Sequence, residues 1–301
     1  MIDSNSQARC NVAMFTGKGG VGKTTCAAAA ALHHASSGKQ TLAISTDATP
    51  SLSHIFETPR DSKLTRVKES LYINELGPEE VKEMWDKTFG GEVYAVFSSF
   101  VAIDYAEFTE FTTSVLPGLS DEFTVDYIRE LSRKSEYETI IWDTAPLGQT
   151  LALLKTPAML GSHLRMAPRI YSKLKLGQKS REPILDILKR WEKLSAVNID
   201  FLRNEVEFTM VTIPEALAVE QLEGIFSELN KHGLKVKRLI INNVVKAEGS
   251  DFLLTKARQQ KSYLEFIHER YSGLEIIELP MFPYEMKGLN RLKEVEKILF
   301  Q

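Results

Sequence analysis

The chain has 301 residues, of which 43% are hydrophobic and 26% are charged, and its formal net charge is −3. This composition is typical of a globular protein with a sizeable core, and the slight negative charge predicts no general affinity for nucleic acid. No stretch approaches the roughly 20 apolar residues that cross a membrane, and residues 1–10 lack the apolar core of a secretion signal. Because the two cysteines, Cys10 and Cys26, form no Cys-x-x-Cys pair, we expect a cytoplasmic protein without disulfides.

Short apolar segments alternate with amphipathic ones along most of the chain, which is the pattern of a parallel sheet covered by helices. We expect strands at Val12–Phe15, Thr41–Ser45, Leu71–Leu76, Thr139–Trp142, Val206–Ile213, Arg238–Asn242 and Glu275–Leu279. A helix is predicted from Thr24 to Ser37, and another from Gly288 to Gln301 that packs its apolar face on the sheet. The predicted fold class is therefore α/β, with a doubly wound and mainly parallel sheet.

The first strand leads into a glycine-rich loop. We predict that nine consecutive residues bind nucleotide phosphates: Gly17, Lys18, Gly19, Gly20, Val21, Gly22, Lys23, Thr24 and Thr25. The glycines allow successive N–H groups to face one anion, and the helix that follows adds the positive end of its dipole. Lys23 can reach the β- and γ-phosphates, and the Thr24 hydroxyl can bind Mg²⁺. A turn without ligand is the alternative, but the lysine–threonine pair and the strand–helix context favour a phosphate-binding loop.

Two other predicted strands lead into acidic residues. Asp143 ends the apolar run Thr139–Trp142, and we expect it to hold Mg²⁺ through water. Pro146 and Gly148 follow in a segment that can bind and release a γ-phosphate, which is the behaviour of a switch. Asp47 follows the second strand, where it can orient the attacking water or, alternatively, cap the next turn.

Residues 88–128 and 155–193 interrupt the alternation, and both stretches carry apolar side chains at helical spacing. We expect a single P-loop ATPase domain over residues 1–301, with an inserted α-helical subdomain formed by about 80–130 and 155–204. The stripe in the first stretch includes four candidates for an apolar groove: Tyr94, Phe97, Val101 and Phe108. The alternative is that these side chains only cover the core.

The early lysine of the loop, Lys18, resembles that of the deviant Walker A loop found in dimeric ATPases. The chain also contains Ser45-Thr46-Asp47, then Asp143-Thr144-Ala145-Pro146, and then Gly288-Leu289-Asn290. In that order these motifs resemble the arsenite-pump ATPase (ArsA) family, and in particular its targeting factors for tail-anchored membrane proteins.

The resemblance implies a homodimer that uses ATP and Mg²⁺, in which Lys18 reaches the nucleotide of the other subunit. It places the adenine pocket at Asn242 and in the loop 280–285, which includes Pro283. It further implies a groove for the C-terminal helix of a client membrane protein, with a membrane receptor as a possible partner, and no binding of nucleic acid.

The sequence departs from the family pattern at several positions. The first switch continues as Asp47-Ala48-Thr49-Pro50, and Gln149 and Ala152 replace a histidine and an arginine of the second. The Cys-x-x-Cys motif that clips the targeting-factor dimer through zinc is missing, so we expect no zinc and a dimer that depends on ATP. Two alternative functions are the ATPase subunit of an arsenite or oxyanion efflux pump, and a partitioning ATPase of the ParA/MinD type.

Overall fold

The computed structural model describes residues 10–47, 51–59, 64–91, 94, 104–106, 119–134, 136–144 and 178–301. It divides the chain into two compact units, which we name by their content. The sheet unit comprises residues 1–77, 131–147 and 205–301, and the helical unit comprises residues 78–130 and 148–204.

The sheet unit is built on eight strands in the order β3-β4-β2-β5-β1-β6-β7-β8. All neighbours are parallel except β3 and β4, so the prediction of a mainly parallel α/β sheet is confirmed. The strands are β1 (Asn11–Gly17), β2 (Thr41–Ser45), β3 (Thr65–Lys68), β4 (Leu71–Glu75), β5 (Thr139–Asp143), β6 (Val206–Thr212), β7 (Val236–Val244) and β8 (Glu275–Pro280). Strand β3, which pairs antiparallel at the sheet edge, was not among the predicted strands.

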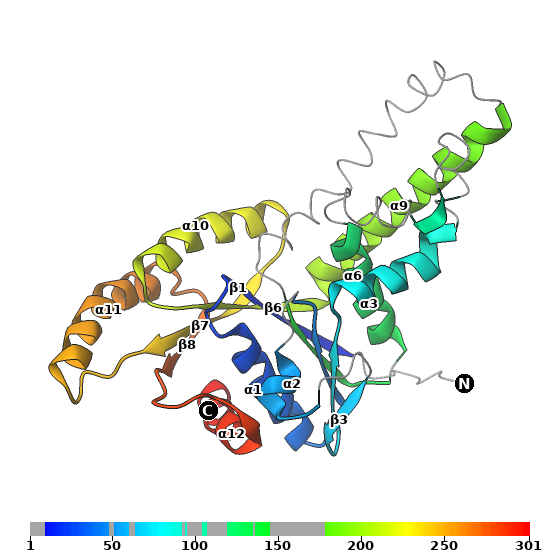
Figure 1. Cartoon of the computed structure of the whole chain (residues 1–301). Helices are drawn as coiled ribbons and strands as arrows, with labels where there is room; N and C mark the ends of the chain where they lie inside the picture. Colours follow the sequence, from blue (N-terminus) through cyan, green and yellow to red (C-terminus); the bar gives the residue numbers. More distant parts are fainter. Residues whose placement is uncertain are drawn as a thin grey trace, which may run out of the picture. The chain divides into compact units, whose positions relative to one another are not determined.

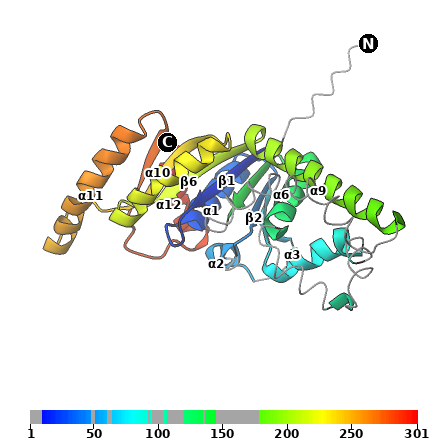
Figure 2. The same ribbon diagram turned by 90° about the horizontal axis from the view of Figure 1, so that it is seen from above.

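Helices cover both faces of this sheet. They are α1 (Lys23–Ser36), α2 (Leu52–Phe56), α10 (Ala216–Lys231), α11 (Asp251–Arg270) and α12 (Gly288–Leu299). Helices α1 and α12 lie on one face, and α10 lies on the opposite face (Figure 1, Figure 2). This arrangement follows from right-handed crossovers: the chain moves from β1 toward β2 in one direction, and from β6 through β7 to β8 in the other.

The core under α1 consists of small side chains on the helix and branched ones on the strands. Residues 26–32 of α1 are all buried, and five of these seven are alanines. Leu292, Val295 and Leu299 of α12 pack into the same core. The last helix therefore contacts β8 of the sheet, where it was expected to pack, and also covers α1. Cys26 is a fully buried member of this core, as expected for a small apolar residue.

The described part of the helical unit contains α3 (Pro78–Trp85), a π-helical turn η1 (Asp86–Gly90), most of α6 (Leu119–Arg133) and α9 (Gln178–Asn204). Helices α6 and α9 are joined by a buried polar contact, in which the Arg129 guanidinium donates to the Asn198 side-chain oxygen at 2.6 Å. Arg129 also pairs with Asp126 one turn earlier. A buried arginine has to be paired, so this contact fixes which residues of the two helices face each other. Among the described residues, no helix is both long and apolar enough to cross a membrane.

Candidate nucleotide site

The glycine-rich loop lies between the end of β1 and the first turn of α1, at the carboxyl edge of the sheet. Gly22 takes a left-handed conformation at the start of α1, and no side chain caps this end of the helix. The first N–H groups of the helix are thus available to an anion. Lys23 is buried, and its ammonium donates a hydrogen bond of 3.2 Å to the Lys18 carbonyl oxygen. Gly19 and Gly20 form the exposed outer edge of the loop.

Asn242 of β7 braces this loop from the neighbouring part of the sheet. Its side-chain amide donates to the Val21 carbonyl oxygen at 2.9 Å. A Cβ atom on Gly22 would lie 2.3 Å from the same amide nitrogen, and the left-handed φ of 94° also disfavours any residue other than glycine. Asn242 was expected in an adenine pocket. The observed hydrogen bond shows that Asn242 supports the backbone of the glycine-rich loop. Its contact with the adenine base stays a prediction.

Asp143 lies at the centre of the site, at the end of β5 and between β1 and β2. It is 1% exposed, and its carboxylate accepts a hydrogen bond from the Ser45 hydroxyl at 3.2 Å. Burial raises the pKa of Asp143 to about 6, against the lowering effects of Thr24, Lys23 and Ser45. The nearby Asp47 acts in the same direction as burial. A divalent cation would favour the ionised carboxylate and reverse this effect.

The residues present fit a bound Mg²⁺. One oxygen of Asp143, Oδ1, is buried and has no hydrogen-bond partner within the described part of the chain. A buried carboxylate oxygen is normally satisfied, so an ion or its water is a natural partner for it. The Thr24 hydroxyl, which lies near the same carboxylate and helps to lower its pKa, supplies the second hard oxygen donor that Mg²⁺ prefers.

Asp47 sits just beyond β2, in a segment tied to β5 at several points. The Thr46 N–H donates to the Asp143 carbonyl oxygen at 3.0 Å, and the Trp142 indole donates to the Thr46 hydroxyl at 3.0 Å. The Asp47 N–H points to the Ser45 hydroxyl at 3.4 Å. Since β2 and β5 are parallel neighbours, Asp47 and Asp143 lie at the same edge of the sheet, beside the phosphate loop.

The remaining site predictions concern other segments. Pro283 is exposed in the turn between β8 and α12. Pro146 and Gly148 of the proposed switch lie outside the described residues, as do three of the four groove candidates, Phe97, Val101 and Phe108. The fourth, Tyr94, is half-buried and packs edge-on against Tyr105, with 4.9 Å between ring centroids. Among the described residues there is no group of three or more His, Cys, Asp or Glu placed to hold a metal ion.

Comparison with known proteins identifies the family. A family model described as Anion-transporting ATPase matches residues 10–301. The chain belongs to the ArsA family. It is 33% identical over 301 residues to "Putative arsenical pump-driving ATPase 2" of Aquifex aeolicus (strain VF5), which spans 96% of this chain and 98% of that protein.

Other ArsA-family relatives carry a different name. The chain is 29% identical to ATPase GET3B of Arabidopsis thaliana, over 96% of this chain and 78% of that protein. It is also 29% identical to ATPase get3 of Botryotinia fuckeliana (strain B05.10), over 94% of this chain and 87% of that protein. The resemblance inferred from the motifs is confirmed, and the protein is an ATPase of the ArsA family.

Sequence reasoning missed the contacts that join the parts of the site. Ser45 was seen only as a neighbour of Asp47, whereas its hydroxyl bonds to Asp143. A polar residue at the end of an otherwise apolar strand, next to a strand that ends in aspartate, was the signal available. Glu75, at the end of β4, has the same kind of position.

Proposed function

We propose that this ArsA-family ATPase works as a homodimer that captures the apolar C-terminal helix of a membrane protein. ATP brings two subunits together and forms an apolar groove for the client, and hydrolysis opens it again. The proposal is carried by two features that occur together in this chain. One is the set of nucleotide-binding residues, and the other is a helical unit with packed and exposed aromatic side chains. A bare ATPase does not need such a unit.

In the proposed reaction, water attacks the γ-phosphate and the β–γ phosphoanhydride bond breaks to give ADP and phosphate. Phosphoryl transfer depends mainly on positioning and on stabilising negative charge. Lys23 and the N-terminus of α1 would hold the phosphates, and Asp47 would orient the water. Thr24 and Asp143 would hold Mg²⁺, which neutralises charge on the phosphate oxygens when it is bound.

Lys18 supports the dimeric part of the proposal. Its side chain is half-buried at the rim of the loop, beside exposed Gly19 and Gly20, and it makes no ion pair with any described residue. Its own carbonyl oxygen is already bonded to Lys23. An ammonium in this position is available to a nucleotide held by a second subunit, where it would act like an arginine finger.

Mixing two inactive variants tests this arrangement. We expect both Lys18→Ala and Asp47→Asn to lower kcat by about 10²-fold or more. An equal mixture should recover about a quarter of the parental activity, because half of the dimers are mixed and each mixed dimer has one complete site. A Lys18→Ala protein that hydrolyses ATP at the parental rate, or a mixture with no recovery, would overturn the action in trans.

The client groove is supported by the aromatic stripe of the helical unit. Tyr105 is 37% exposed and packs against Tyr94 of the stripe, so these two side chains form one aromatic surface. The chain is also similar to relatives named ATPase GET3B and ATPase get3. A surface of this kind can bind an amphipathic or apolar helix whose apolar face packs against the aromatic side chains.

Crosslinking to a defined client tests the groove. The probe is a globular domain carrying a C-terminal helix of about 20 leucines and alanines, and its control carries a polar helix of equal length. In the Asp47→Asn background with ATP, we expect crosslinks to the apolar probe only. The Phe97→Asp/Phe108→Asp variant should lose them and Phe252→Asp, which changes an exposed aromatic on α11, should keep them. Equal crosslinking of all proteins, or of both probes, would refute the groove.

The relative named for an arsenical pump favours a second candidate, an ATPase that drives efflux of a metalloid anion. Such a site needs thiolate ligands. Burial raises the pKa of Cys10 to about 11 and that of Cys26 to about 12, so neither thiol is ionised at neutral pH. These two are the only cysteines in the chain. Antimonite should therefore leave the ATPase rate unchanged, and a several-fold stimulation would favour the pump instead.

A further inference from the structure

Glu75 is a buried carboxylate beside the nucleotide site that the reaction described above does not use. It ends β4, is 4% exposed, and pairs in register with Ser45 of β2. One oxygen, Oε1, accepts a hydrogen bond of 2.9 Å from the backbone N–H of Ser53. The other, Oε2, is buried and has no hydrogen-bond partner among the described residues.

This carboxylate is hard to explain by stability. A buried polar atom without a partner costs about 1–3 kcal/mol, and a charged one costs more. Ile73 and Leu71, two and four residues earlier on the same face of β4, show that apolar side chains suit this environment. The role of Glu75 therefore lies in what it holds.

Glu75 anchors the start of α2, which follows Asp47 closely in the chain. Before it, Thr46 and Asp47 bond to β5 and to Ser45. In the first turn of α2, the Ser53 N–H donates to Glu75. Both anchors lie at the ends of neighbouring strands, because the Leu76 N–H donates to the Ser45 carbonyl oxygen at 2.8 Å.

We propose that Glu75 is a positioning residue for ATP hydrolysis: by binding the Ser53 N–H it fixes the start of α2, six residues after Asp47, and so limits where the Asp47 carboxylate can lie. This inference rests on the proposed role of Asp47 in orienting water. It does not depend on the dimer or on the client. Small displacements at such a group have large effects, since a shift of about 1 Å can cost 10²-fold in rate.

Three substitutions at Glu75 separate positioning from packing. Glu75→Leu removes the acceptor and fills the space with apolar atoms, and it should lower kcat by about 10- to 100-fold. Because it also leaves the Ser53 N–H without its acceptor, the melting temperature should fall slightly, and kcat is measured well below that temperature. Glu75→Ala should lower kcat similarly. Glu75→Gln keeps an acceptor oxygen and should restore most of the lost activity. The affinity for ATP, measured with a fluorescent analogue, should change by less than about two-fold because Glu75 does not touch the phosphate loop.

Asn74 offers a matched control on the same strand. It is also buried with an unpartnered side-chain oxygen among the described residues, but it faces the opposite side of β4. Asn74→Leu should leave kcat near the parental value. Hydrogen exchange at the start of α2 should accelerate in Glu75→Leu and not in Asn74→Leu, which reports the lost bond directly.

A double-mutant cycle decides whether Glu75 acts through Asp47. If it does, Asp47→Asn/Glu75→Leu should be no slower than Asp47→Asn alone. Parental kcat in Glu75→Leu, an equal loss in Asn74→Leu, or fully additive losses in the cycle would each overturn the inference. Failure of the Asp47 proposal is distinguishable, because Asp47→Asn would then turn over at the parental rate whatever residue occupies position 75.

Discussion

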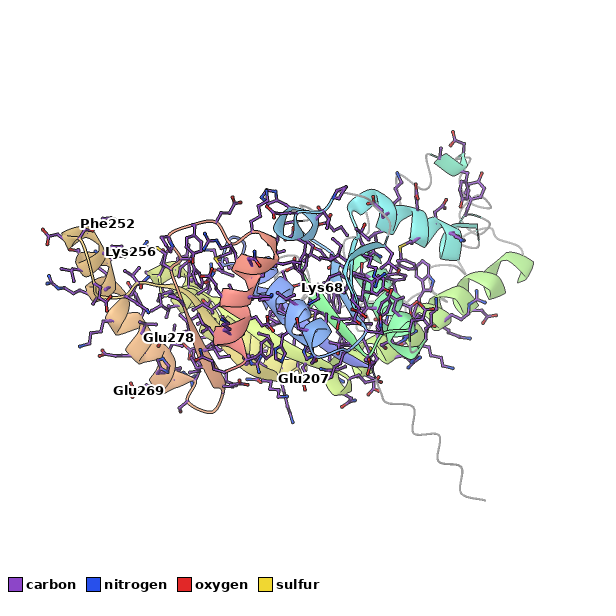
Figure 3. All side chains as sticks on the ribbon, turned by 90° about the horizontal axis from the view of Figure 1, so that it is seen from below. Lys68, Glu207, Phe252, Lys256, Glu269 and Glu278 are labelled. Carbon is purple, nitrogen blue, oxygen red and sulfur yellow. The ribbon has the colours of Figure 1, made fainter. Side chains whose placement is uncertain are left out.

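Two helices of the sheet unit, α1 and α11, are built in opposite ways. Helix α1 has 14 residues, nine of them buried, whereas α11 has 20 residues and buries two, Gln260 and Ile267. The alanines of α1 allow the sheet, α2 and α12 to enclose it, and its first turn holds the phosphate loop. Helix α11 lies at the edge with aromatic residues facing solvent, among them Phe252, labelled in Figure 3. The helix that begins at the glycine-rich loop is thus tightly enclosed, whereas the helix at the edge of the sheet unit is not.

The largest effect should come from the glycines that precede these two helices. Gly22 and Gly249 have similar left-handed φ angles, 94° and 99°. A Cβ on Gly22 would lie 2.3 Å from the Asn242 amide, whereas a Cβ on Gly249 would meet its nearest atom at an ordinary 3.4 Å. We expect Gly22→Ala to cost about 2–4 kcal/mol and Gly249→Ala about 1 kcal/mol, the cost of the backbone strain alone. Urea unfolding without nucleotide measures both. Equal losses would show that the Asn242 amide moves aside.

Alanine enlargement tests the two helices more directly. Ala29 of α1 is completely buried, and Ala257 of α11 is half-exposed. Because overpacking a close-packed core forces shifts, Ala29→Leu should lower the free energy of unfolding by about 1–3 kcal/mol. Ala257→Leu should change it by less than about 0.5 kcal/mol. A tolerated Ala29→Leu would mean that α1 is less tightly enclosed than its burial indicates.

Acid should weaken the end of α1 through His34. Burial lowers the pKa of His34 to about 4, with Lys39, His33 and Arg238 acting in the same direction and Glu207 opposing them. The folded state then binds fewer protons than the unfolded state between about pH 4 and 6.5, so stability falls as the pH falls through this range. After allowance for solvent screening, we expect a loss of roughly 1–2 kcal/mol.

The His34→Gln variant is the comparison for this effect. Since glutamine does not titrate, the difference in unfolding free energy between pH 7 and pH 4.5 should be smaller than in the parent. Urea unfolding at the two pH values measures it. An unchanged difference would assign the acid sensitivity to other groups.

The smallest effect should come from α11. Phe252 is 70% exposed, so Phe252→Ser should change the stability of an isolated subunit by less than about 0.5 kcal/mol. Thermal unfolding at two protein concentrations checks this. A larger loss that grows with concentration would mean that this aromatic is covered by a second copy in solution.

Much of the sheet follows from the sequence, because buried parallel strands are short apolar runs with clear ends. The strand predicted at Thr41–Ser45 has the observed bounds, and the others differ by a few residues. The missed strand β3 has only four residues, none of them buried, so it lacks the apolar pattern. The predicted helix at the C-terminal end is present, but its packing on α1 depends on the return of the chain to that face after β8.

The parts of the site formed by consecutive residues were predictable from the sequence. The parts that depend on which strands are neighbours in the sheet were not. The loop before α1 and the acids after β2 and β5 were visible as motifs. Asn242 donates to Val21 across 221 residues of the sequence, and the Ser53 N–H donates to Glu75 across 22. Such contacts require the strand order, which the motifs do not contain.

The contact between α1 and α12 also has a consequence for how the polypeptide is made. His33 and its partner Glu296 are separated by 263 positions. At synthesis rates of about 5–20 residues per second, roughly 13–53 s pass before the ribosome delivers the second partner. Throughout that interval the face of α1 that later packs against α12 lacks this cover. We therefore expect growing chains of this protein to be vulnerable to premature association while they are still being translated.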